Sequence, residues 1–115
     1  MSNHLCWFEV TTTDPAKAQV FYKSLFGWKI AKARKDYYQM TTGRIPHGGL
    51  LKKLPLVPNT GVYFYIHVAS ITATIAKVKK LGGGLLVPKT KIPGFGYYAF
   101  VSDLDGNPVG LFSEK

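Results

Sequence analysis

Residues 7–13, WFEVTTT, alternate in the way that is typical of a half-buried β-strand. Because successive side chains of a strand point to opposite faces, this stretch divides into an apolar face and a mixed face. The apolar face carries Phe8 and Val10, and the mixed face carries Trp7, Glu9 and Thr11.

The period of the pattern changes after this strand from two residues to that of a helix. Asp14 is suited to cap a helix, and Pro15 is suited to the first helical position. Apolar residues then recur at helical spacing, and Gly27 provides a typical helix end. The pattern predicts a helix over residues 15–25, with a buried face made of Ala18, Phe21, Tyr22 and Leu25.

The same order of elements starts again at Tyr63. Residues 63–69, YFYIHVA, predict a second strand with Tyr63, Tyr65 and His67 on one face. Ser70 can cap a second helix over residues 71–81, which the glycines at 82–84 end. Each helix is followed by three short apolar segments that predict strands: WKIAKA, YYQMTT and GGLLKK, then GLLVPK, GYYAFVS and PVGLF.

The chain therefore reads as two βαβββ modules, at about residues 4–53 and 61–113, joined by the Pro-rich segment 53–61. Each module alone would have a marginal core, so we predict a single α+β domain over residues 1–115. Gly49 and Gly110 fall at matching places in the last strand of each module.

The net charge of +9 comes from 15 Lys and Arg against six acidic residues. The basic residues are spread along the chain without a nucleic-acid-binding motif, so a solvated basic surface is the simpler interpretation, and we do not expect nucleic acid as a partner. No apolar run is long enough to span a bilayer, so we expect no membrane association. The single cysteine, Cys6, favours a cytoplasmic location.

Three segments together resemble one known family: DPAKAQVFYKSLFGW, HVASITATIAKVKKLGG and DLDGNPVGLF. They are similar to the vicinal oxygen chelate superfamily, which includes glyoxalase I, bleomycin- and fosfomycin-resistance proteins and extradiol dioxygenases. The resemblance covers the chain from about Trp7 to Phe112. It implies that the paired βαβββ modules form a curled mixed sheet around a cleft, and that the chain forms a homodimer.

Members of that superfamily that use a metal hold it with side chains from the first and last strand of each module. Carried onto this chain, the resemblance places these positions at Trp7, Gly49, Tyr63 and Gly110. Indole, neutral phenol and glycine are poor ligands for a divalent cation. We therefore expect no metal and no cofactor. A non-standard site built from His4, His47, His67 and Glu9 is the alternative.

Aromatic side chains and open space above the glycines instead predict a binding site for a small organic molecule. Its predicted lining is Trp7, Glu9, Thr11, Gly49, Tyr63, Tyr65, His67 and Gly110. Glu9 and His67 are also the candidates for acid–base catalysis. Structural interpretations stay open: Glu9 paired inside the fold, His67 hydrogen-bonded in a core or dimer interface, Trp7 and Tyr63 packed on each other, and the glycines as strand kinks.

The leading functional hypothesis is a metal-free binding protein of this superfamily. The alternatives are a lyase, isomerase or dioxygenase with a non-standard metal site or Glu/His acid–base chemistry, and a basic nucleic-acid-binding or partner-binding module. The segment PKTKIPGFGYYAF has two interpretations, a lid whose lysines attract an anionic ligand or a plain connection.

Overall fold

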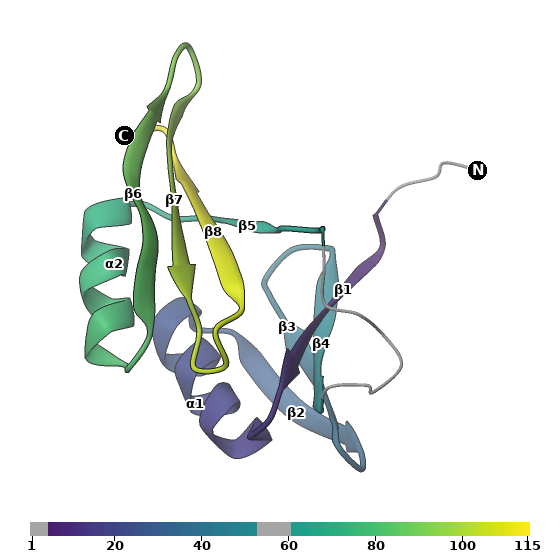
Figure 1. The fold of residues 1–115 in the computed structure, drawn as a ribbon. Helices are drawn as coiled ribbons and strands as arrows, with labels where there is room; N and C mark the ends of the chain where they lie inside the picture. Colours follow the sequence, from purple (N-terminus) through teal and green to yellow (C-terminus); the bar gives the residue numbers. More distant parts are fainter. Residues whose placement is uncertain (1–4, 53–60) are drawn as a thin grey trace. The chain divides into compact units, whose positions relative to one another are not determined.

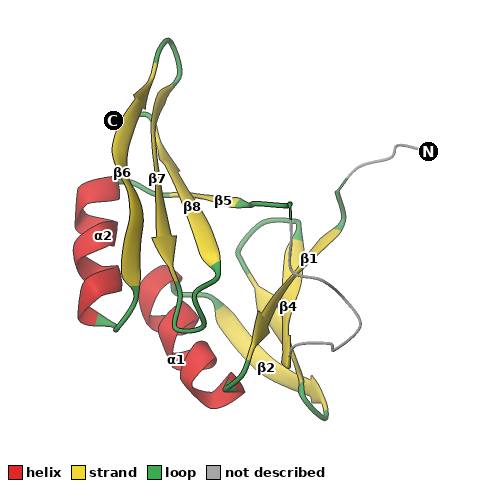
Figure 2. Cartoon of the chain, in the orientation of Figure 1, coloured by secondary structure: helices red, strands yellow, loops and turns green. Residues whose placement is uncertain are grey.

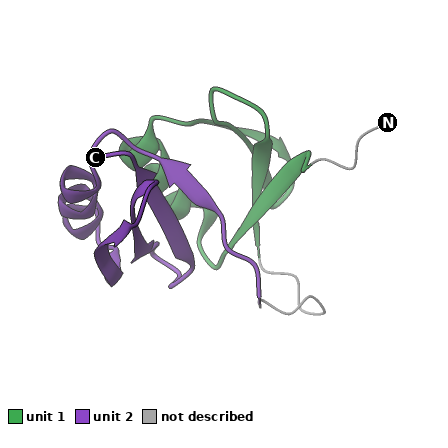
Figure 3. Cartoon of the chain, turned by 90° about the horizontal axis from the view of Figure 1, so that it is seen from above, with its two compact units in different colours: residues 1–58 green, residues 59–115 purple. Residues whose placement is uncertain are grey.

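The computed structural model describes residues 5–52 and 61–115, and both predicted modules are present (Figures 1 and 2). The chain divides into two compact units, unit 1 over residues 1–58 and unit 2 over residues 59–115 (Figure 3). Each unit contains one helix and its own four-stranded sheet, so the mixed α+β architecture is confirmed. His4 and nearly all of the predicted connection lie outside the described residues.

Both units follow the order strand–helix–strand–strand–strand. The elements of unit 1 are β1 (Trp7–Thr12), α1 (Pro15–Phe26), β2 (Lys29–Arg34), β3 (Tyr37–Thr41) and β4 (His47–Lys52). The elements of unit 2 are β5 (Tyr65–His67), α2 (Ile71–Lys80), β6 (Gly84–Ile92), β7 (Gly96–Ser102) and β8 (Pro108–Ser113).

The two sheets have equivalent topologies, with strand orders β1-β4-β3-β2 and β5-β8-β7-β6. In each sheet the first strand runs parallel to the last, while the remaining pairs are antiparallel. The register places Gly49 opposite Glu9 and Gly110 opposite Tyr65. The two glycines therefore do occupy matching places in the internal repeat.

Both helices begin as the sequence predicts. The Asp14 carboxylate accepts a hydrogen bond from the Lys17 backbone N–H at 3.2 Å, and the Ser70 hydroxyl accepts one from the Ala73 N–H at 3.1 Å. Gly27 ends α1 with a left-handed φ of 72°, a conformation that costs glycine little. At the end of α2, Gly82 and Gly83 follow the helix, whereas Gly84 already belongs to β6.

Within each described unit the helix packs on one face of the sheet, and the other face, which has no helix of the same unit, is called the helix-free face. In unit 1 the covered side includes Val10, Leu50 and Met40, which are buried together with the predicted face of α1. Under α1, the Trp28 indole stacks on the Tyr22 ring at 5.6 Å between centroids. In unit 2 the buried core contains Ile71 and Val78 of α2 and Ala99, Val101, Val109 and Leu111 of the sheet.

The predicted strand at residues 63–69 is shorter in the structure, where β5 covers Tyr65–His67. Beyond β5, the Val68 N–H still reaches the Phe112 carbonyl oxygen at 2.9 Å. The chain leaves the sheet after Val68, because Ser70 is the N-cap of α2. Neither helix of the described residues has the length and apolar character required to cross a membrane.

Candidate functional site

The helix-free face of unit 1 carries a hydrogen-bonded group of three residues, which we call the Tyr37 network: Trp7, Glu9 and Tyr37. Trp7 and Glu9 lie on β1, on the face opposite buried Val10, and Tyr37 begins β3. The Tyr37 phenol donates to Glu9 Oε2 at 2.7 Å and accepts from Trp7 Nε1 at 3.0 Å. Glu9 is thus paired with a tyrosine, which agrees with the structural interpretation of Glu9 as a residue paired within the fold.

The ring of Tyr37 reaches β1 by crossing the intervening strand β4 at Gly49. A Cβ atom built on Gly49 would overlap the Tyr37 hydroxyl and lie 2.5 Å from Tyr37 Cζ. Only a residue without a side chain leaves room for the ring at this position. The prediction of open space above Gly49 is therefore wrong, because the ring of Tyr37 fills that space.

Arg34 completes this surface from the edge strand β2. Its guanidinium carbon lies 4.1 Å from the centroid of the Tyr37 ring, which is a cation–π contact. The pKa of Tyr37 is raised above its ordinary value, first by burial of the phenol and then by its hydrogen bond to the Glu9 carboxylate. Tyr37 is therefore a neutral hydrogen-bond donor at neutral pH.

Unit 2 repeats the relationship between glycine and tyrosine with different residues. A Cβ atom on Gly110 would lie 2.5 Å from Tyr65 Cδ2 and 2.8 Å from the Phe64 carbonyl oxygen. Tyr65 thus lies over Gly110, and the predicted open space is absent here too.

Four rings gather on the same helix-free face of unit 2, and we call them the Phe100 cluster. Ring centroids of Tyr63, Tyr65 and Tyr98 lie 5.1, 5.3 and 6.2 Å from that of Phe100. Tyr63 and Tyr65 nevertheless remain 61% and 53% exposed. The cluster is therefore an accessible aromatic surface held in place by contacts among its own rings.

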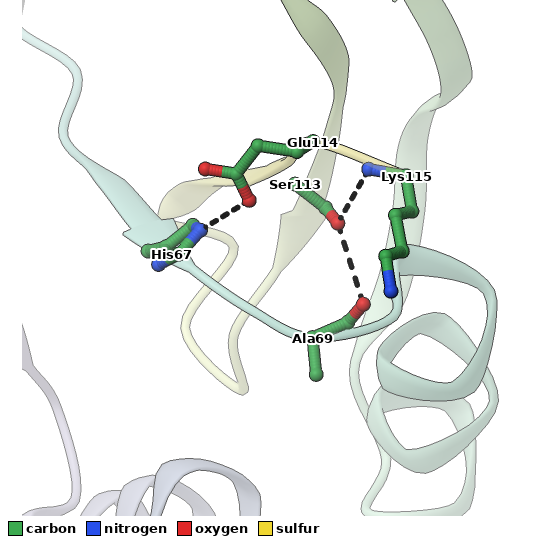
Figure 4. A network of polar contacts seen from close by, with 5 residues as sticks. All are labelled: His67, Ala69, Ser113, Glu114 and Lys115. Atoms are coloured by element: carbon green, nitrogen blue, oxygen red, sulfur yellow. Dashed lines mark hydrogen bonds and ion pairs between the residues drawn. The ribbon is translucent and has the colours of Figure 1, made fainter.

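His67 takes part in a polar contact at the end of the same unit (Figure 4). Its Nε2 lies 2.7 Å from Glu114 Oε1, and both side chains are largely exposed. The hydrogen bond from His67 holds the pKa of Glu114 below its ordinary value. Beside this pair, the Ser113 hydroxyl donates to the Ala69 carbonyl at 3.3 Å and accepts from the Lys115 backbone N–H at 3.2 Å.

The positions where the family resemblance would place a metal do not offer a suitable donor set. The Trp7 N–H is donated to Tyr37, tyrosine rings cover both glycines, and the Tyr63 ring packs on Phe100. Among residues 5–52 and 61–115, no three His, Cys, Asp or Glu side chains gather closely enough to hold an ion. These residues do not fit a divalent cation, which requires several oxygen, nitrogen or sulfur ligands.

The structure brings together only some of the predicted site residues. In unit 1 it joins Trp7, Glu9 and Gly49 through Tyr37, while Thr11 lies half-buried opposite Leu51. In unit 2 it joins Tyr63 and Tyr65 through Phe100 and places Gly110 beneath Tyr65. Trp7 packs with Tyr37 and Tyr63 with Phe100, each within its own unit.

Four residues that take part in these contacts were not predicted from the sequence: Tyr37, Arg34, Phe100 and Glu114. The alternation of YYQMT contained a usable signal, because Tyr37 and Met40 fall on opposite faces and Met40 is buried. The remaining contacts depend on register, which the sequence pattern alone does not give.

Comparisons with known proteins find one family. The model of the "Glyoxalase/Bleomycin resistance protein/Dioxygenase superfamily" matches residues 3–111. A "Glyoxylase-like domain-containing protein" of Didymella fabae is 31% identical over 108 residues, which cover 86% of this chain and 84% of that protein.

A "Putative glyoxylase CFP32" of Mycobacterium bovis is also 31% identical, over 119 residues that cover 92% of this chain. The chain spans only 44% of that protein. Among solved structures, the fosfomycin resistance protein FosX from Listeria monocytogenes superposes with a TM-score of 0.79 at 15% identity, covering 100% of this chain and 96% of that chain. This last similarity concerns the fold alone.

Proposed function

Because this chain belongs to the Glyoxalase/Bleomycin resistance protein/Dioxygenase superfamily, we propose that it binds a small planar organic molecule without a resident divalent cation. The name of the superfamily joins enzymes with resistance proteins, so membership by itself does not decide between catalysis and binding. The side chains of this chain favour binding.

The observation that carries the proposal is the Phe100 cluster. Tyr63 and Tyr65 expose more than half of their surface, yet both pack on Phe100. Rings that are already positioned lose little conformational entropy when a flat ligand stacks on them. Their hydroxyl groups add polar ends to an otherwise apolar surface, which is the usual composition of a site for small organic molecules.

The metal-free part of the proposal is supported by the donor chemistry at four positions. Two of them are glycines, and the other two carry an indole N–H already engaged with Tyr37 and the phenol of Tyr63. An acid–base pair of Glu9 and His67 is not part of the proposal, because Tyr37 holds Glu9 and Glu114 contacts His67.

Binding is tested by isothermal titration of the whole protein with 2-naphthamide, a neutral planar aromatic probe. We expect saturable binding that Tyr63→Ala weakens by up to about tenfold, since a ring–ring contact is lost. Phe95→Ala is the matched control, because Phe95 is an aromatic residue that is 75% exposed and lies outside the cluster. Equal effects of the two substitutions, or no binding at all, would contradict the proposal.

The metal content is tested separately by elemental analysis of protein purified without chelators. We expect substoichiometric zinc, manganese, iron and nickel, and no increase in melting temperature when these ions are added. A tightly held stoichiometric divalent ion would overturn the metal-free part and revive the alternative of a lyase, isomerase or dioxygenase.

A homodimeric state and a cytoplasmic location are further parts of the proposal. Dimerisation rests on the family resemblance, and the location rests on the free thiol of Cys6. Sedimentation equilibrium would show a mass near twice 12.7 kDa if the dimer forms. A gel shift at low salt tests the nucleic-acid alternative, because electrostatic binding is strongest there.

A further inference from the structure

Among residues 5–52 and 61–115, acidic side chains are engaged within their own units, while most basic side chains have no acidic partner. Only six acids face 15 Lys and Arg residues. Five of the six have an identified partner: Glu9 with Tyr37, Asp14 with the Lys17 N–H, Asp36 with Lys52, Asp103 with the Asn107 N–H, and Glu114 with His67. The excess of positive charge therefore remains available to external anions.

Arg34 is one of two basic residues of the described part of the chain that lie over an aromatic ring, the other being Lys89 over Tyr97, and it is the one with a planar guanidinium. It ends the edge strand β2 directly opposite Tyr37 and stacks on that ring at 4.1 Å. The contact places the guanidinium over the ring, and a guanidinium in such a contact can still donate through its N–H groups. The ion pairs of the described residues join Lys52 to Asp36 and His67 to Glu114, so Arg34 has no carboxylate partner there.

The ring beneath Arg34 is itself fixed from its far end. The Tyr37 hydroxyl is bound to Glu9 and Trp7, and the ring lies over Gly49. The phenol donates a hydrogen bond to Glu9, and the ion pairs of the described residues do not join Glu9 to Arg34. Arg34 and the partly exposed indole of Trp7 thus contact the same tyrosine, Arg34 at its ring and Trp7 at its hydroxyl.

We propose that Arg34, stacked on Tyr37, binds the carboxylate of an aromatic organic acid. A planar carboxylate matches the paired N–H donors of a guanidinium, and a bidentate contact adds geometric specificity. The aromatic body of such a ligand would lie against ring surface of unit 1 itself, where Trp7 is 38% exposed. The inference rests on the proposed function for the aromatic class of the ligand and adds its charge.

The test compares two probes that differ in one group, 2-naphthoate and the neutral 2-naphthamide, by isothermal titration at low ionic strength. The wild-type protein is expected to bind the acid about tenfold more tightly than the amide, since a hydrogen-bonded charge pair is formed. Arg34→Gln is expected to reduce the affinity for the acid to that for the amide and to leave the affinity for the amide unchanged.

Lys32→Gln is the matched control, because it removes one positive charge from the same exposed strand. An equal loss of naphthoate binding in both variants would show a general attraction of charge and overturn the assignment to Arg34. Arg34→Lys keeps the charge but removes the planar fork, so it should bind the acid less well than the wild type.

The outcomes separate the inference from the proposed function. If the wild type binds both probes equally, the carboxylate site is wrong while aromatic binding stands. If neither probe binds, aromatic binding and the carboxylate site are both overturned.

Discussion

The phenol ring of Tyr37 lies over Gly49, and the ring of Tyr65 lies over Gly110 in the equivalent place of the other unit. In each pair, a glycine on the last strand of the unit lies beneath an aromatic ring from a neighbouring strand. Tyr37 comes from β3, and Tyr65 comes from β5, where it is directly opposite Gly110. The glycines thus explain how large rings lie flat on the helix-free faces of the two sheets, where a bulkier residue would hold them away.

Gly49→Ala is expected to destabilise the protein by about 1–3 kcal/mol, the usual cost of overpacking. The new methyl group would overlap the Tyr37 hydroxyl. Urea unfolding of Gly49→Ala, Tyr37→Leu and the double variant forms a double-mutant cycle. We expect Gly49→Ala to cost less in the Tyr37→Leu protein, since the ring that blocks it is gone. An unchanged cost would refute this explanation of Gly49.

We expect the stability cost of Gly110→Ala to be relieved less by removal of the covering ring than the cost of Gly49→Ala is. The added methyl group would meet both Tyr65 and the carbonyl oxygen of Phe64, which lies 2.8 Å away. A backbone atom cannot move aside as a side chain can. The same urea measurement with Tyr65→Ala should therefore show only a partial rescue, and a full rescue would show that the carbonyl contact is unimportant.

Much of this arrangement follows from the sequence, because amphipathic periods and caps are local properties. Asp14 and Ser70 begin the two helices as expected, and the repeat correctly matched Gly49 with Gly110. The contacts of Tyr37 could not be predicted, since they depend on the register of three strands. The register of β1 and β4 places Gly49 opposite Glu9. The family resemblance had placed the metal-ligand position of this strand at Trp7, two residues before Glu9.

The ionisation of Tyr37 provides a direct test of its environment. Its pKa is raised above the ordinary 10.0 by burial and by the Glu9 carboxylate. The folded protein therefore favours the neutral phenol, and this contribution to stability is present below pH 10 and lost as the pH rises through the higher folded-state pKa. The phenolate absorbance that disappears in Tyr37→Phe should titrate above that of free tyrosine. Titration at or below the free value would contradict the network.

The contact between His67 and Glu114 predicts a measurable shift in the opposite direction. The pKa of Glu114 is lowered, chiefly by the hydrogen bond from His67. Carboxyl carbon NMR should show Glu114 titrating below an ordinary glutamate, and His67→Ala should move it back upward. A carboxyl pKa that His67→Ala leaves unchanged would show that this exposed contact does not persist in solution.

The turn before β8 depends on one buried carboxylate, and its removal should be more damaging than that of an exposed acid. Asp103 is only 5% exposed, and its Oδ1 accepts the backbone N–H groups of Asp105 at 2.9 Å and Asn107 at 2.8 Å. Its Oδ2 also accepts from the Asn107 side-chain amide at 2.8 Å. These bonds hold the chain as it turns through Gly106, whose φ is 81°.

Asp103→Ala would leave the N–H groups of the turn without their acceptor, so we expect a loss of about 2 kcal/mol in the free energy of unfolding. Asp103→Asn keeps one oxygen for the two backbone donors but presents an amide to the amide of Asn107, and it should cost less. Glu114→Gln is the control, because Glu114 is exposed and outside the turn. Urea unfolding should rank the three variants in this order, and an Asp103→Ala protein as stable as the control would show that the carboxylate does not hold the turn.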